Sequence, residues 1–411
     1  MVAAADRGQL RELARIRDFR ILLLSRLVSN LGNGITPVAL SFGVLGLDGG
    51  NGRSLSIVNA AHMVSLVVFM LAGGVVADRF GRCRTVGGSD MIGSLVVGLA
   101  AWLLISGNAT VWLLASTGFL LGALHAMWQP AYRGILPVMV PRELLQAANA
   151  ANGIIANTTY LTGAALAGVL VAAFGAGWAI MVDAVSFLIA GLLVWGLRHL
   201  DRRAPADRSQ SMGSQLREGW QEFVSRRWMV VTVVSLSFFF LSFEAFQAVV
   251  APVQMKNALG GARDMGFMMA AWGAGGLLGM TAAVRLRPRR PMLAAWSIMP
   301  VHAVWMFALA VPAPLPVLML TAVISGSAID LSFTWWGTTL QTHVPEDVIS
   351  RVGSFDALGV ALFGPVGLVL AGPLVDSIGA SSTSVIVGVV ALLAGTAPLA
   401  FGSVRRVESL V

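Results

Sequence analysis

Two long apolar segments are joined by a short motif with the sequence Gly73-Gly74-Val75-Val76-Ala77-Asp78-Arg79-Phe80-Gly81-Arg82. Gly73 and Gly74 have no side chains, so they allow two helices to approach closely. Asp78 stands where an apolar helix would leave a membrane, and it can accept hydrogen bonds from the N-terminus of a neighbouring helix. Arg79 and Arg82 place positive charge directly after the apolar segment, as cytoplasmic loops do. The motif therefore predicts two transmembrane helices joined by a basic cytoplasmic turn.

The composition of the whole chain indicates the same surroundings. Of its 411 residues, 56% are hydrophobic and 12% are charged, whereas a soluble domain carries about 25% charged residues. Only helices and closed barrels satisfy their backbone polar groups inside a bilayer. Long runs of Ala, Gly, Leu and Val favour helices over the alternating pattern of a barrel. We therefore predict an all-α polytopic membrane protein embedded in a lipid bilayer.

A hydropathy window of helical length predicts twelve transmembrane helices, each with about 20 apolar residues. They are expected at residues 19–46, 56–78, 85–107, 110–133, 145–172, 177–198, 228–256, 263–286, 291–311, 315–341, 350–374 and 381–403. A polar stretch divides them into two sets of six, which predicts two lobes. The expected organisation is a cytoplasmic segment at 1–18, a six-helix lobe at 19–198, a cytoplasmic linker at 199–227, a second six-helix lobe at 228–403 and a cytoplasmic tail at 404–411.

The positions of the basic residues predict the orientation of the chain. Of the 28 Lys and Arg residues, only Arg53, Lys256 and Arg263 fall in the expected outer loops, and Arg26 falls inside the first helix. All others lie on one side, which the positive-inside rule assigns to the cytoplasm together with both termini. This bias accounts for the net charge of +8 without a nucleic-acid partner. The use of Arg in place of Lys is typical of a high-GC bacterium, so we expect the inner membrane.

Comparison of the chain with itself indicates an internal repeat. A shift of 204 residues superposes several Gly and Pro residues, which are listed here as pairs: Gly122/Gly326, Pro141/Pro345, Gly163/Gly367, Gly168/Gly372 and Gly175/Gly379. Because each half holds an even number of helices, the halves share their orientation in the membrane. This is the arrangement of a two-lobed transporter whose halves are parallel repeats.

The motif at residues 73–82 resembles the cytoplasmic loop signature of the major facilitator superfamily, G-x-L-A-D-R-x-G-R, with Val76 in the place of Leu. This resemblance implies twelve helices in two pseudo-symmetric lobes and transport by alternating access, not an enzyme. It assigns a role in the gate and loop to Gly73, Gly74, Asp78, Arg79, Gly81 and Arg82. It also implies that Asp356, near the start of the eleventh helix, lies close to Asp78.

Three further stretches, residues 26–35, 137–149 and 364–379, look like the twelve-helix drug–proton antiporters, a branch that includes macrolide, tetracycline and siderophore exporters. Two positions depart from that branch. Asn33 stands where the branch often has Asp, a candidate proton site, and Asn cannot titrate. The fifth-helix signature G-x-x-x-G-P-x-x-G-G is only partly matched by residues 163–168, which lack Pro.

Ionisable residues within the predicted spans are candidates for proton coupling, because charge in hydrocarbon is costly and is usually functional. Glu244 lies in the outer half of the seventh helix and Asp330 near the middle of the tenth. Burial disfavours the charged form of a carboxyl group, so either could exchange a proton; cation recognition and a structural role stay open. His125 is a further candidate. Arg26 and Asp90 fit either a structural pair or gate residues.

Aromatic residues near the two carboxylates predict a wall for the substrate cavity. Phe240 and Phe243 flank Glu244, Trp335 and Trp336 follow Asp330, and Asn157 is a polar candidate on the fifth helix. Aromatic faces beside a carboxylate suit a lipophilic cation, although lipid contact would also explain aromatic side chains. No spacing of His, Cys, Asp and Glu predicts a metal site, and no cofactor is expected.

Taken together, these features predict a monomeric transporter that exports hydrophobic drugs or natural products in exchange for protons. A dedicated metabolite or siderophore exporter or importer of the same fold is the first alternative. A membrane sensor or scaffold that does not transport is the second.

Overall fold

The computed structural model describes residues 7–201, 220–344 and 349–409, which contain helices and no strands. Most of the predicted linker, and Pro345, lie outside these ranges. Within the described helices, the side chains of Asp78 and Asp356 are also outside the description. The chain forms two compact units, and each is described by itself.

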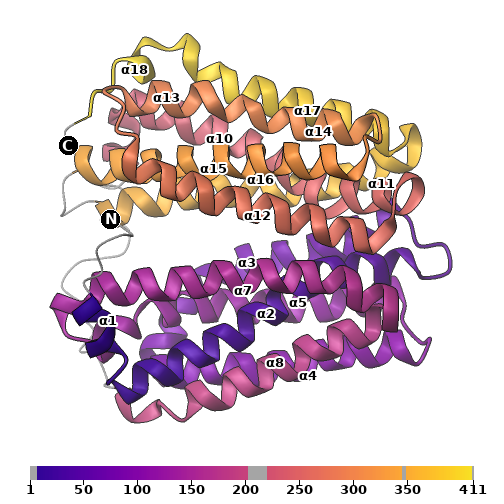
Figure 1. Cartoon of the computed structure of the whole chain (residues 1–411), viewed down its shortest axis with the longest axis horizontal. Helices are drawn as coiled ribbons and strands as arrows, with labels where there is room; N and C mark the ends of the chain where they lie inside the picture. Colours follow the sequence, from indigo (N-terminus) through magenta and orange to yellow (C-terminus); the bar gives the residue numbers. More distant parts are fainter. Residues whose placement is uncertain (1–6, 202–219, 345–348, 410–411) are drawn as a thin grey trace. The chain divides into compact units, whose positions relative to one another are not determined.

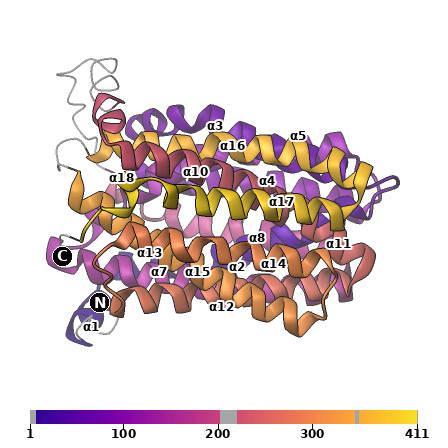
Figure 2. The same cartoon turned by 90° about the horizontal axis from the view of Figure 1, so that it is seen from above.

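The first unit contains the described residues up to 201 together with residues 255–270. Its helices are α1 (Arg7–Leu13), α2 (Arg17–Leu45), α3 (Gly52–Phe80), α4 (Arg82–Ile105), α5 (Val111–Arg133), α6 (Leu136–Met139), α7 (Leu145–Phe174) and α8 (Ala176–Trp195). The long helices lie alongside one another (Figures 1 and 2), with α2 packed on α7 and α8, α3 on α5, and α4 on α8.

The second unit contains the described residues from 220 to 254 and from 271 onward. The helices that form it or extend into it are α10 (Arg227–Ala245), the π-helical η4 (Phe246–Val250), α11 (Ala251–Ala258), α12 (Gly261–Arg285), α13 (Pro291–Ile298), α14 (His302–Ala310), α15 (Leu315–His343), α16 (Ile349–Ile378), α17 (Ala380–Thr396) and α18 (Gly402–Arg405). Here α10 packs on α16 and α17, and α14 packs on α15 and α17.

The twelve predicted spans are confirmed by twelve long helical segments in the described part of the chain. The seventh is α10 continued through η4 into α11, and the ninth is α13 continued into α14 through a 3₁₀ turn at Pro300. Ten of the twelve meet the length and hydropathy expected of a membrane span. The other two are α2, which carries Arg26 and several Ser, Asn and Gly residues, and α16, whose apolar segment among the described residues is Leu362–Ile378.

Apolar side chains lie on the outside of this protein as well as in its core. Large apolar side chains point outward, such as Leu95 and Trp112, which are 74% and 72% exposed. Charged and polar side chains are inside, among them Arg26, Asp183 and His302. Large apolar side chains on the outside, with charged side chains among the buried residues, are expected for helices in a bilayer.

Glycines at helix crossings confirm the internal repeat. A Cβ added to Gly122 on α5 would lie 2.1 Å from the carbonyl oxygen of His62, and one on Gly326 would lie 1.9 Å from that of Trp272. Such contacts exclude any side chain, so the α3–α5 crossing in the first unit corresponds to the α12–α15 crossing in the second.

Two further pairs of repeated glycines also occupy equivalent places. Gly163 on α7 would place a Cβ 2.0 Å from the Leu31 carbonyl oxygen of α2, and Gly367 on α16 would place one 2.1 Å from the Leu241 carbonyl oxygen of α10. Gly175 and Gly379 precede α8 and α17 with φ of 85° and 83°. These left-handed conformations favour glycine, and they show that the two halves share turns as well as crossings.

Candidate functional site

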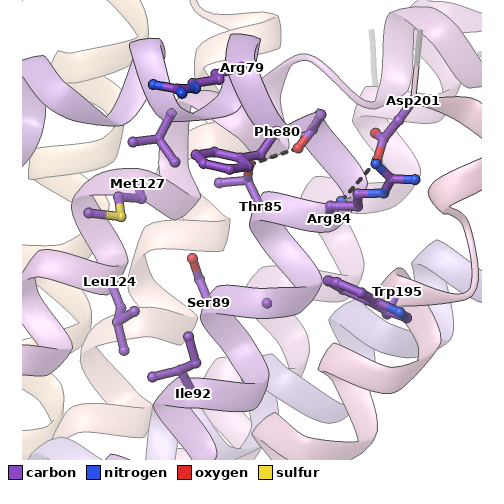
Figure 3. Close-up of a pocket in the computed structure, with 13 residues that line it drawn as sticks. Arg79, Phe80, Arg84, Thr85, Ser89, Ile92, Leu124, Met127, Trp195 and Asp201 are labelled. Carbon is purple, nitrogen blue, oxygen red and sulfur yellow. Dashed lines mark hydrogen bonds between the residues drawn. The ribbon is translucent and has the colours of Figure 1, made fainter. Parts of the chain in front are cut away.

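The predicted cytoplasmic motif forms the turn between α3 and α4, which is drawn in Figure 3. Gly81 has φ of 95°, and a Cβ on it would lie 2.6 Å from the Asp201 carboxylate. Glycine is therefore required here for both conformation and space. The Arg82 guanidinium donates to the carbonyl oxygen of Gly134, at 2.6 Å, and so ties the start of α4 to the end of α5.

Asp201 caps the N-terminus of α4 from a distant part of the sequence. Its two carboxylate oxygens accept hydrogen bonds from the backbone N–H groups of Cys83, at 2.7 Å, and Arg84, at 3.1 Å. These N–H groups would otherwise have no partner within the helix, and a carboxylate also complements the helix dipole. Sequence reasoning expected Asp78 to make a contact of this type and placed Asp201 in the linker.

The Arg26 side chain is held inside the first unit by groups from two other helices. Its guanidinium lies 3.3 Å from the carboxylate of Asp90 on α4, and both residues are almost fully buried. The same guanidinium lies over the rings of Trp128 and Tyr132 on α5. The Tyr132 hydroxyl donates to the side-chain carbonyl oxygen of Asn152 on α7, at 2.6 Å. Helices α2, α4, α5 and α7 are thus joined by one polar network.

A second buried carboxylate in this unit is also satisfied. Asp183 on α8 accepts hydrogen bonds from the hydroxyls of Thr36 and Ser186 and packs against Gly32 of α2. Asn33, the residue that replaces a common acidic position, follows Gly32 in the sequence, and its amide nitrogen donates to the Ser29 hydroxyl at 3.4 Å.

His125 on α5 packs edge-on against His62 of α3, with ring centroids 5.3 Å apart. The Nδ1 atom of His62 lies 3.3 Å from the carbonyl oxygen of Gly118. His125 also contacts the ring of Phe187 on α8 and has no hydrogen-bond partner among the described residues. The pair lies close to the α3–α5 crossing at Gly122.

The second unit contains a cluster of aromatic side chains from α10, η4, α12, α14 and α15. Its members are Phe239, Phe240, Phe243, Phe246, Trp272, His302, Trp305 and Phe333. The ring of His302 is fully buried against Phe239, Phe243 and Trp305. Its Nδ1 lies 2.6 Å from the Ser325 hydroxyl, while its Nε2 has no partner in the described ranges.

Glu244 and Asp330 differ from the buried carboxylates of the first unit in their lack of a polar partner. Both side chains are half-buried, and neither makes a hydrogen bond or ion pair with any residue that the structure describes. Glu244 lies on α10 just before η4, a π-helical turn of the kind often found at functional sites. The Asp330 carboxylate lies against Gly276 of α12, where a Cβ would be 2.1 Å from its oxygen.

The remaining cavity candidates have different surroundings. Phe240 and Phe243 belong to the aromatic cluster, next to Glu244 in the sequence. The Trp335 indole donates to the carbonyl oxygen of Leu286, and Trp336 packs on Trp228, so these two residues join helix ends instead. Asn157 is exposed on α7.

Comparison with known proteins adds independent findings. Residues 12–410 match the family described as transmembrane secretion effectors. The chain is 28% identical over 406 residues to the multidrug efflux pump Tap of Mycolicibacterium fortuitum, a match that covers 94% of this chain and 96% of the pump. The fold is similar to that of the nucleoside transporter NupG, with a TM-score of 0.75 at 14% identity over 93% of this chain and 98% of that one.

A bacterial homologue of the human lysosomal transporter Spinster, solved in an inward-facing and unoccupied conformation, is similar in fold as well. Its TM-score is 0.75 at 13% identity, covering 99% of this chain and all of that one. At such low identity these two structures establish the fold alone.

Proposed function

The chain belongs to the transmembrane secretion effector family of the major facilitator superfamily. From this premise we propose that it exports hydrophobic drugs or natural products and that protons drive the export. Members of this superfamily are transporters, so the chain is a multi-pass membrane transporter of small molecules. The direction of transport, the substrate class and the coupling ion are the parts that we propose.

The unpaired state of Glu244 and Asp330 carries the proposal of proton coupling. Asp90 and Asp183 have partners that favour a fixed charge or hydrogen-bonded state, whereas Glu244 and Asp330 have none among the described residues. A carboxyl group in a membrane is costly to keep charged when no cationic partner is near. Such a group is therefore suited to bind and release a proton. If the two transport states differ in proton affinity at such a group, proton binding shifts the balance between them.

The aromatic cluster supports the proposed substrate class. Phe240 and Phe243 place apolar, polarisable faces on the helix that also carries Glu244. Such faces suit flat hydrophobic molecules, and a neighbouring carboxylate would favour those that carry positive charge. The relative Tap, whose name describes a multidrug efflux pump, supports the same class. We also propose that the transporter works as a monomer in the bacterial inner membrane, with both termini in the cytoplasm.

Accumulation of fluorescent lipophilic cations in cells that overproduce the protein tests this proposal. We expect the wild type to lower dye content and an uncoupler to abolish the effect. Glu244→Gln or Asp330→Asn should reduce export at least tenfold at equal membrane abundance. Asp48→Asn, which changes an exposed carboxylate in a loop, is the matched control and should export like the wild type.

Two results would contradict the proposal in different ways. If export persists with the uncoupler and in both carboxylate variants, these two residues do not couple protons to transport. If cells that overproduce the wild type contain as much dye as cells with the empty vector, broad-spectrum export is excluded. A dedicated metabolite or siderophore transporter would then be favoured, ahead of a sensor or scaffold.

A further inference from the structure

A cavity of about 770 Å³ lies in the first unit beside the turn between α3 and α4. It is lined by residues of α3, α4, α5 and α8 and by Asp201, and Figure 3 shows its side chains. The cavity is at the end of the unit that the distribution of Arg residues places in the cytoplasm. The aromatic cluster and Glu244 belong to the other unit.

The rim of this cavity is positively charged. Arg79 and Arg84 are both exposed, and neither forms an ion pair with any described residue. The guanidinium of Arg79 lies 5.7 Å from the centre of the Phe80 ring. Asp201 also lines the cavity, but both of its carboxylate oxygens are occupied by the backbone N–H groups at the start of α4. Two cationic side chains are therefore available to an anion at the rim.

Below the rim the cavity contains a polar group that is not hydrogen-bonded within the described ranges. The Ser89 side chain is only 8% exposed and makes no hydrogen bond to any described residue. Figure 3 shows its hydroxyl pointing toward the space beneath Thr85 and Phe80. By contrast, the Thr85 hydroxyl already donates to the carbonyl oxygen of Gly81. The Ser89 hydroxyl opens onto the cavity, so it can donate a hydrogen bond to a ligand there.

The floor of the cavity is apolar and faces outward. Ile92, at this floor, is 53% exposed, and Leu124, Met127 and Trp195 complete the wall, while Phe80, which is 58% exposed, lies nearer the rim (Figure 3). Exposed aromatic residues at a membrane boundary are typical of the interface with lipid headgroups. A soluble anion would use the charged rim and leave this floor empty. A molecule with an anionic head and an apolar tail would fill both parts.

We propose that this cavity binds an anionic phospholipid. Its phosphate lies between Arg79 and Arg84 and accepts a hydrogen bond from the Ser89 hydroxyl, and one acyl chain runs along Ile92 and Leu124. Guanidinium groups are well suited to phosphate. Occupancy would brace the α3–α4 turn at the membrane surface.

Native mass spectrometry of the purified protein tests the proposal. The probes are phosphatidylglycerol and phosphatidylcholine with the same acyl chains, added in equal amounts. The wild type should retain phosphatidylglycerol preferentially. Arg84→Gln should weaken its retention about fivefold, which is the contribution expected of one basic residue near an anionic lipid. Arg142→Gln removes an exposed Arg outside the cavity and is the matched control.

A second variant tests the cavity without removing charge. A Cβ on Gly88 would meet only the Trp195 ring, at 3.7 Å, so Gly88→Ala is accommodated and Gly88→Leu extends into the cavity. Gly88→Leu should lose phosphatidylglycerol while keeping the melting temperature of Gly88→Ala. Equal retention of both lipids by the wild type would overturn the proposal, as would equal losses in Arg84→Gln and Arg142→Gln. Displacement of the lipid by millimolar inorganic phosphate would overturn it in favour of a site for soluble anions.

Discussion

Arg26 of α2 and Asp90 of α4 form an ion pair of 3.3 Å, with side chains that are only 2% and 3% exposed. The contact is made by a single guanidinium nitrogen, and the Nε atom of Arg26 has no partner in the described part of the chain. The rings of Trp128 and Tyr132 cover the guanidinium, 4.7 and 4.9 Å from its carbon atom. The pair is therefore a structural connection between helices that aromatic faces shield from solvent.

Removing one member of this pair should destabilise the protein more than removing both. Arg26→Met leaves the Asp90 carboxylate buried without a cation, and the loss of one partner of such a pair costs about 3–5 kcal/mol. Arg26→Met combined with Asp90→Leu replaces the pair by apolar groups and should recover most of that loss. Unfolding in detergent, followed by circular dichroism, measures the difference. A double variant no more stable than Arg26→Met would contradict this account.

The close crossing of α2 and α7 predicts a position-specific effect of a single methyl group. In Gly163→Ala the new Cβ would lie 2.0 Å from the Leu31 carbonyl oxygen, so the helices must separate, at a cost of about 1–3 kcal/mol. Gly153→Ala, on the same helix, meets nothing within 4 Å and should keep the wild-type melting temperature. Gly326→Ala and Gly337→Ala provide the same comparison on α15. If the two variants of each helix have equal melting temperatures, the helices at these crossings are not in the close contact described here.

The cap on α4 predicts a local effect. Asp201→Ala removes the acceptor of the Cys83 and Arg84 N–H groups and should cost about 1 kcal/mol. Hydrogen exchange at these two amides should accelerate, while Asp201→Asn, which keeps one acceptor oxygen, should have a smaller effect. The start of α5, where the Thr110 hydroxyl accepts from the Leu113 N–H, is an internal reference that should not change. Unchanged exchange at both amides would exclude the cap.

The proposed orientation predicts which loops a membrane-impermeant maleimide reaches. The chain has one cysteine, Cys83, which is buried and should give a low background. Asn108→Cys, in the exposed loop before α5, should be labelled in intact cells. Leu286→Cys, after α12, should be labelled only once the membrane is permeabilised. The reverse pattern would place both termini outside.

The helices could be predicted from the sequence because each depends on the local run of apolar residues. The irregular turns within these helices could not be predicted in the same way. The π-helical turn at Phe246–Val250 follows no local sequence rule, and the 3₁₀ turn at Pro300 is indicated only by its Pro. The glycine pairs were visible at a shift of 204 residues because they occupy equivalent crossings. The opposing carbonyl groups were not visible, since a backbone contact leaves no mark on residue type.

The candidate site could be predicted only in part because pairing depends on residues far apart in the chain. Sequence alone identified Glu244 and Asp330 as candidates for proton coupling, and Arg26 and Asp90 as either a structural pair or gate residues. It could not show that Asp90 is paired with Arg26 while the other two carboxylates lack a described partner. Asp201 could not be recognised as a cap because 118 residues separate it from Cys83. Whether Glu244 and Asp330 couple protons to transport stays a prediction.

The partner of Arg26 also has a consequence for biogenesis. Helix α2 leaves the ribosome before α4 and α5, and an Arg within a lone helix disfavours its insertion through the translocon, by up to about 3 kcal/mol at the helix centre. Asp90 is 64 residues further along the chain, on α4. We therefore expect α2 to remain only loosely held at the translocon until α4 and α5 have been synthesised, so that the helices from α2 to α5 enter the bilayer as a group.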